Sequence, residues 1–167
     1  GVMISSPLAG EDKGEGAKAT ADLPRFLTIF ESVCQTIAYA HARGCKVFMA
    51  LNTYPQAANP GPWQRAIDTA ARVGVDAVIL ADPGLMRYAA QHYPQLRLHV
   101  SVQGSATNFD ALRLYREQFG VVRAVLPRVL SLAQVEQLIA KTPVEIEVFG
   151  FGSLCVMVEG RCQLSSY

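Results

Sequence analysis

The feature that most constrains the fold is a regular alternation of strand-like and helix-like segments that begins near residue 22. Two successive strands with one helix between them are expected to be parallel, because the chain must cross back over the sheet face. Helical patterns cover 22–41, 63–73, 85–93, 108–119 and 132–141. The expected strands cover 46–51, 77–81, 96–102, 122–126 and 144–149. The fold class is therefore α/β, built from parallel (β/α) repeats.

Two of the expected strands carry polar side chains on one face. Arg97, His99, Ser101 and Gln103 alternate with apolar residues, and the strand at 144–149 has Glu145 and Glu147 on one face. A strand covered by helices on both faces is normally apolar on both. We therefore expect an incomplete TIM-barrel-like domain at 22–167 whose strands face a polar interior, preceded by a divergent or poorly ordered segment at 1–21.

Composition limits the classes of function. Half of the 167 residues are hydrophobic and 17% are charged, so one sizeable core is expected. The formal net charge is +1, which gives no reason to expect a nucleic-acid partner. The apolar runs are too short for a transmembrane segment, and the start does not resemble a secretory signal, so a cytoplasmic location is expected. We expect this sequence to be a piece of a longer protein.

Candidate site residues follow from the parallel strands, because sites in such folds form at the carboxyl ends. The residues at or just after the ends of the five expected strands are Asn52, Asp82, Gln103, Arg128 and the turn 150–152. Helix capping and turn formation explain the same residue types equally well. A second group faces the expected interior, where an internal ion-pair lattice is the alternative to a site; it comprises His99, Arg123, Glu145 and Glu147.

Four cysteines complete the candidates. Cys34 and Cys45 fit small core positions. Cys155 and Cys162 are separated by six residues on a glycine-containing stretch directly after the last strand, which suits a pair of thiolate metal ligands. Two thiolates do not complete a zinc site or an iron-sulfur cluster, so spacing alone indicates at most half of a metal site.

The same stretch resembles a known family. Residues 147–167 read E-V-F-G-F-G-S-L-C-V-M-V-E-G-R-C-Q-L-S-S-Y and are similar to the signature of the peptidase U-32 family. The resemblance extends through 126–131, 99–103 and 79–82, and covers about 30–167. It implies a barrel-like domain and a 4Fe-4S cluster held by four cysteines. Cys155 and Cys162 match the first two, the others would lie beyond residue 167, and Cys34 and Cys45 match none.

Within the family, the motifs most resemble members of oxygen-independent ubiquinone biosynthesis. That resemblance implies an iron-sulfur subunit for hydroxylation of a ubiquinone precursor without O2, paired with a UbiV-like homologous subunit, with prephenate as oxygen donor. The alternatives are a tRNA or rRNA hydroxylase of the same family, a collagenase-like protease, and a non-catalytic scaffold that carries the cluster. The protease lacks a recognisable nucleophile and base pair.

A dicarboxylate donor suggests roles for the candidate residues. Arg128 offers a planar fork that suits an anion clamp, and His99 is a candidate proton donor or acceptor. Gln103 and Asn52 are candidates for orienting the substrate, with Asp82 and Glu147 as further members of the site. The alternative is that Arg128 only neutralises Glu147.

Overall fold

The computed structural model describes residues 2–5 and 23–152. Its strands are β1 (Val2–Ser5), β2 (Val47–Leu51), β3 (Ala77–Leu80), β4 (Arg97–Val100), β5 (Arg123–Val125) and β6 (Glu145–Glu147). Its helices are α1 (Leu23–His41), α2 (Gly61–Val73), α3 (Pro83–His92), α4 (Phe109–Phe119) and α5 (Leu132–Lys141), with a 3-10 turn, η1 (Val102–Gly104), after β4.

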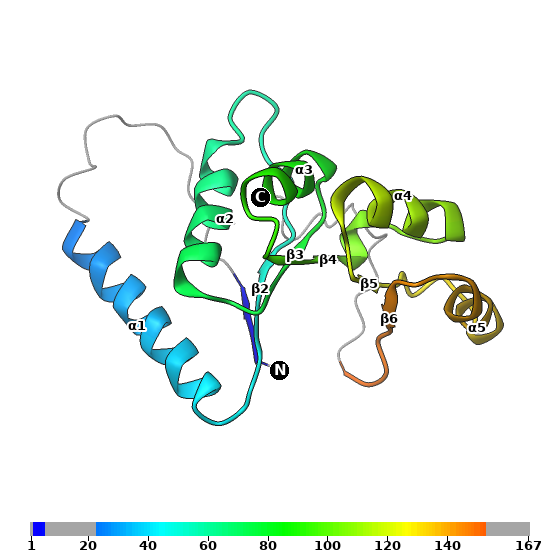
Figure 1. Ribbon diagram of the computed structural model, residues 1–167, viewed down its shortest axis with the longest axis horizontal. Helices are drawn as coiled ribbons and strands as arrows, with labels where there is room; N and C mark the ends of the chain where they lie inside the picture. The colour runs from blue at the N-terminus through cyan, green and yellow to red at the C-terminus, as the bar shows by residue number, and fades with distance from the viewer. Residues whose placement is uncertain (1, 6–22, 153–167) are drawn as a thin grey trace.

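The six strands form one sheet in the order β1-β2-β3-β4-β5-β6, and all neighbouring pairs are parallel. The order never reverses, which is the arrangement of a (β/α) barrel and not of a doubly wound sheet. Figure 1 shows α1 to α5 following one another around the strands in chain order. The five expected parallel strands are confirmed, and β1, within the segment 1–21, is a strand that the sequence pattern did not reveal.

One face of the sheet forms the core with the helices. Residues at alternate positions, among them Val47, Leu80 and Val100, are fully or almost fully buried. They belong to one apolar cluster with Ile67 of α2 and Leu112 of α4. Burial of this face stabilises the helices against the sheet, since each helix alone presents only one apolar stripe.

The opposite face carries a row of residues in register across the strands. Ile79 on β3 pairs with His99 on β4, His99 pairs with Arg123 on β5, and Arg123 pairs with Glu145 on β6. The row passes from apolar to charged as it approaches β6. The expected polar inner face is therefore present, concentrated on three strands.

Two strands end two residues before the predicted position. β4 ends at Val100, because Ser101 caps η1 by accepting a hydrogen bond from the Gln103 N–H. Gln103 therefore lies on a 3-10 turn and not on the strand face that holds His99, which corrects our placement. β6 likewise ends at Glu147, before Phe149.

Helix ends follow local rules. Asp82 caps α3 by accepting from the Leu85 N–H at 2.8 Å, and Ser131 with Gln134 forms a capping box at the start of α5. The Asn108 side chain caps α4 by accepting from the Ala111 N–H. None of the helices in the described part of the chain has the length and apolar character to cross a bilayer.

Candidate functional site

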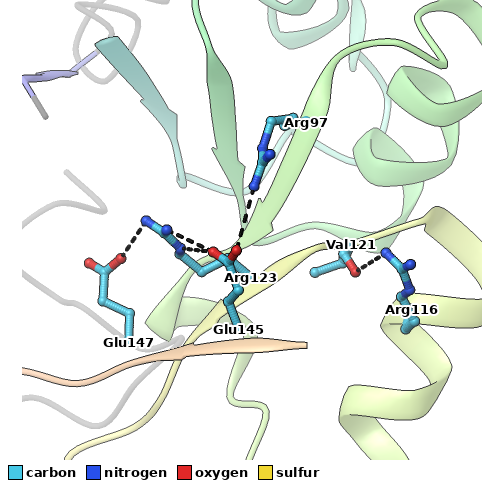
Figure 2. Close-up of polar contacts among 6 residues, drawn as sticks. All are labelled: Arg97, Arg116, Val121, Arg123, Glu145 and Glu147. Carbon is cyan, nitrogen blue, oxygen red and sulfur yellow. Dashed lines mark hydrogen bonds and ion pairs between the residues drawn. The ribbon is translucent and has the colours of Figure 1, made fainter. Parts of the chain in front are cut away.

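An ion-pair network occupies the polar inner face of β4, β5 and β6. Arg123 Nη2 lies 2.7 Å from Glu145 Oε2, and Arg97 Nη2 lies 3.8 Å from Glu145 Oε1. Arg123 Nη1 also lies 3.5 Å from Glu147 Oε2, so one guanidinium joins both carboxylates (Figure 2). The hydrogen bond from Arg123 holds the pKa of Glu145 below its usual range. Ion pairs therefore join Arg123, Glu145 and Glu147, three of the four residues for which an internal lattice was the alternative, and these side chains are partly exposed.

His99 lies beside this network and is buried, with 1% of its surface exposed. Its ring meets the Phe48 ring edge-on at 5.2 Å between centroids. Nε2 is buried and has no hydrogen-bond partner among the described residues. Burial, followed by the charges of Arg123 and Arg97, lowers the pKa of His99 to about 4, so the imidazole is neutral at physiological pH. A neutral ring offers one donor and one acceptor nitrogen.

A second cluster forms where β2, β3 and β4 end. The Tyr54 hydroxyl donates to the backbone carbonyl of Gln103 at 2.6 Å, and the Tyr115 hydroxyl donates to that of Gly104 at 3.1 Å. Together they hold consecutive carbonyls of η1. Ser105, which follows η1, has a φ of 50°, a conformation that needs support from its surroundings in a non-glycine residue.

Burial first, and then the Asp82 carboxylate, raise the pKa of Tyr54. Burial, Tyr54 and Asp82 likewise raise the pKa of Tyr115. Asp82 and Gln103, both predicted site residues, are thus brought to one cluster by Tyr54. Sequence reasoning missed Tyr54 and Tyr115; the position of Tyr54 just after a strand end was the available signal.

Arg128 lies in a different part of the carboxyl edge. Its guanidinium carbon is 4.9 Å from the centroid of the Phe149 ring. Both residues line a cavity of about 260 Å³ between the end of β5, the start of α5 and the chain after β6. Glu147 lies 3.5 Å from Arg123 on the neighbouring strand.

The cysteines and Asn52 complete the predicted residues. Asn52 directly follows β2 and is half-buried. Cys34 is half-buried on α1, whereas Cys45 is exposed, which corrects its expected place in the core. Cys155 and Cys162 lie outside the described residues. Among the residues described, no group of three or more His, Cys, Asp or Glu side chains is placed to hold a metal ion.

A singly wound parallel sheet with a polar inner face and polar side chains at its carboxyl edge defines part of a (β/α) barrel. The family model for Peptidase family U32 matches residues 25–167. The chain belongs to this family, as the motifs predicted.

Several relatives are known by name. The chain is 37% identical over 129 residues to tRNA hydroxylation protein P of Escherichia coli, covering 77% of this chain and 28% of that protein. It is 31% identical over 135 residues to the 23S rRNA 5-hydroxycytidine C2501 synthase of the same organism, covering 81% of this chain and 20% of that protein. The chain thus spans less than a third of the length of these relatives.

A solved structure supports the fold. The U32 peptidase Mk0906 superposes with a TM-score of 0.57 at 22% identity, covering 70% of this chain and 50% of that chain. At this identity the match shows a shared fold alone. The relatives named above are hydroxylation proteins of tRNA and rRNA, so the comparisons support the U32 family but not the narrower resemblance to UbiU of ubiquinone biosynthesis.

Proposed function

We propose that the protein is a component of an O2-independent hydroxylase that acts on a nucleobase of tRNA or rRNA. The observation that carries this proposal is the 37% identity to tRNA hydroxylation protein P across 77% of the chain. The rRNA synthase supports the same chemistry on a second class of RNA. RNA hydroxylation was the alternative in the sequence analysis, and it replaces the ubiquinone precursor as the favoured substrate.

The near-neutral charge does not exclude this substrate. A net charge of +1 argues against a broad electrostatic footprint on nucleic acid. Sequence-specific recognition of RNA, however, targets unpaired bases through stacking and hydrogen bonds, and needs only a few side chains. The expectation of no nucleic-acid partner therefore gives way to an RNA substrate bound at a local site.

His99 is proposed as a neutral hydrogen-bonding group of the site. With a pKa of about 4 it carries no charge near pH 7, so it would offer one donor and one acceptor nitrogen and would not act as a standing imidazolium acid. Asn52 and Gln103 are proposed to orient the substrate with their amide groups. Asp82 uses Oδ1 to cap α3 and is proposed to hold polar groups of the substrate with its charge.

Arg128 is proposed as an anion clamp for the oxygen donor, with prephenate as the candidate. Its guanidinium carbon lies 4.9 Å from the Phe149 ring centroid, and the planar guanidinium is a fork that suits a carboxylate. Lysine keeps the charge but not the plane, so Arg128→Lys is expected to lose hydroxylation and keep stability. Full activity of Arg128→Lys with unchanged dependence on the donor would contradict the clamp.

Cys155 and Cys162 are proposed as two of the four ligands of a 4Fe-4S cluster, as the family motif implies. The cluster would supply electron transfer for the hydroxylation. The expected UbiV-like partner was part of the ubiquinone hypothesis. For an RNA hydroxylase, we keep as a proposal only that the protein pairs with a second protein of the U32 family.

Complementation tests the proposal. The full-length protein is expressed in an Escherichia coli strain that lacks tRNA hydroxylation protein P, and tRNA nucleosides are analysed by mass spectrometry. We expect a nucleoside that has gained one oxygen atom to reappear. Ribosomal RNA and extracted quinones are measured in parallel, in strains that lack the corresponding hydroxylases. Restoration of quinone hydroxylation without any RNA product would overturn the assignment to RNA.

A further inference from the structure

We propose that the ring of Tyr54 is a stacking platform for the unpaired nucleobase that the enzyme modifies or for its immediate neighbour. This inference rests on the proposed function and adds the residue that would receive the RNA. The site lies at the carboxyl ends of β2, β3 and β4, in the cluster formed by Tyr54, Asp82 and η1.

The position of Tyr54 is fixed by a hydrogen bond between distant parts of the chain, and the residue is still partly exposed. It lies in the loop after β2, and its hydroxyl reaches the Gln103 carbonyl, 49 residues further along the chain, at 2.6 Å. β3 lies between β2 and β4, so the side chain spans the end of the middle strand. Even so, 45% of the residue is exposed.

The loop that carries Tyr54 is itself held. Trp63 Nε1 of α2 donates to Thr53 Oγ1 at 3.0 Å, next to Tyr54 in the chain. On the other side, Tyr115 fixes the Gly104 carbonyl, and a Cβ on Gly104 would lie 2.7 Å from Val100 Cγ2. Both ends of the Tyr54 contact are therefore rigid, so binding a ligand to the ring costs little additional conformational entropy.

The hydroxyl of Tyr54 is already engaged, and burial and the Asp82 charge raise its pKa, so the phenol stays protonated. What the residue offers to a ligand is a flat aromatic face. An exposed aromatic ring at the carboxyl edge of the sheet suits a nucleobase, which needs a stacking surface and hydrogen bonds to its edge. Asn52 lies two residues before Tyr54, and Tyr54 contacts the backbone carbonyl of Gln103, so both amide residues belong to the same edge.

Chemistry on a nucleobase supports this choice of ligand. An enzyme that modifies a base in structured RNA must take it out of its stack, which costs a few kcal/mol. A fixed aromatic surface replaces part of the lost stacking without selecting for one base, since every base has a π face. Specificity would then come from the neighbouring polar side chains.

The test compares three substitutions in the full-length protein. Binding of a fluorescent unpaired-loop RNA from tRNA is measured by anisotropy, with a fully paired RNA of the same length as reference. Tyr54→Leu removes the aromatic face and is expected to weaken binding by about five- to 150-fold, the range for loss of one base-aromatic stack. Tyr54→Phe and Tyr54→Trp keep a ring and are expected to bind the loop RNA close to wild type.

Tyr39→Leu is the matched control. Tyr39 is an exposed tyrosine too, at 62%, but it belongs to α1 and not to the carboxyl edge, and its ring lies 3.4 Å from the Arg43 guanidinium carbon. Its substitution is expected to leave RNA binding unchanged. Urea unfolding of each variant checks that the fold is intact.

Two outcomes would overturn the stacking proposal. Wild-type affinity in Tyr54→Leu would show that the ring is not a platform. Equal losses of RNA affinity in Tyr54→Phe, Tyr54→Leu and Tyr54→Trp would also contradict it. They would show that the Tyr54 hydroxyl, through its contact with η1, supports binding and that the aromatic face does not. Either result leaves the RNA hydroxylase assignment standing, because complementation by the wild-type protein tests that separately.

Discussion

Arg123 and Glu145 are direct partners in the register of β5 and β6, and their side chains meet at 2.7 Å between Nη2 and Oε2. The same arginine contacts Glu147 (Figure 2). In the strand register it is also the partner of His99 on β4. One guanidinium therefore sets the charge environment of the polar inner face. Removing it changes the titration of groups on both neighbouring strands.

The first prediction concerns this charge. Burial is the main cause of the low His99 pKa and persists in Arg123→Met, so the pKa is expected to rise above about 4 but to stay below the ordinary 6.5, because one of the two neighbouring positive charges is lost. The pKa of Glu145 is expected to rise too, since its hydrogen-bond donor is gone. NMR titration of the imidazole and carboxyl signals measures both. Arg113→Met, which removes an arginine paired with Asp110 at 3.0 Å on α4, should move neither.

The second prediction concerns stability against pH. His99 binds a proton near pH 6.5 when unfolded but only near 4 when folded, so the unfolded state takes up more protons between these values. The contribution of neutral His99 to the free energy of unfolding is therefore fully present above pH 6.5 and is lost as the pH falls toward 4. We expect a loss of about 2 kcal/mol after solvent screening is allowed for.

Urea unfolding at several pH values measures this loss, and His99→Gln is the control because an amide does not titrate. Between pH 4 and 6.5, the free energy of unfolding of His99→Gln should change less with pH than that of the wild type. Identical slopes in the wild type and His99→Gln between pH 4 and 6.5 would contradict the assignment.

The third prediction separates the two roles of Asp82. Asp82→Ala removes the cap of α3 and is expected to lower the free energy of unfolding by about 1 kcal/mol. Asp82→Asn keeps a side-chain acceptor for the Leu85 N–H and is expected to preserve stability. If the charge serves the substrate, both variants lose RNA hydroxylation. Normal hydroxylation in Asp82→Asn would show that the charge of Asp82 does not serve the substrate and that its role is to cap α3.

The fourth prediction concerns the turn that Tyr54 and Tyr115 hold. A methyl group added in Gly104→Ala would meet Val100 Cγ2 at 2.7 Å and the Tyr115 hydroxyl at 3.4 Å. We expect a destabilisation of about 1–3 kcal/mol from this overpacking, measured by urea unfolding. Gly150→Ala, where nothing lies within 4 Å of the added atom, is the control and should change little.

The fifth prediction concerns the cysteines. Cys155→Ser or Cys162→Ser in the full-length protein, reconstituted anaerobically with iron and sulfide, is expected to abolish iron-sulfur absorbance and the paramagnetic signal of the reduced cluster. Cys34→Ser and Cys45→Ser should retain both signals, since these residues lie on α1 and before β2. Retention of the cluster in Cys155→Ser and Cys162→Ser would refute the ligand assignment.

Parts of the candidate site were predictable because they follow from local pattern. The alternation of polar and apolar residues in β4 and β6 placed His99 and Glu145 on a polar face. The apolar residues that alternate with them in each strand pack against the helices. Gln103 was misplaced because the alternation continues past Val100, while the Ser101 hydroxyl turns the backbone into η1. Side-chain capping of this kind competes with the strand and overrides its pattern.

The sequence by itself determined the (β/α) repeat, the parallel direction of the strands and the two-faced character of those near the carboxyl end, because periodicity and crossover length are local properties. Only the tertiary structure decided which residues meet. Register between strands placed Arg123 between His99 and Glu145, and the packing of the loop after β2 against η1 joined Tyr54 to Gln103 across 49 residues. Such contacts depend on how strands and loops align in space, which no local pattern encodes.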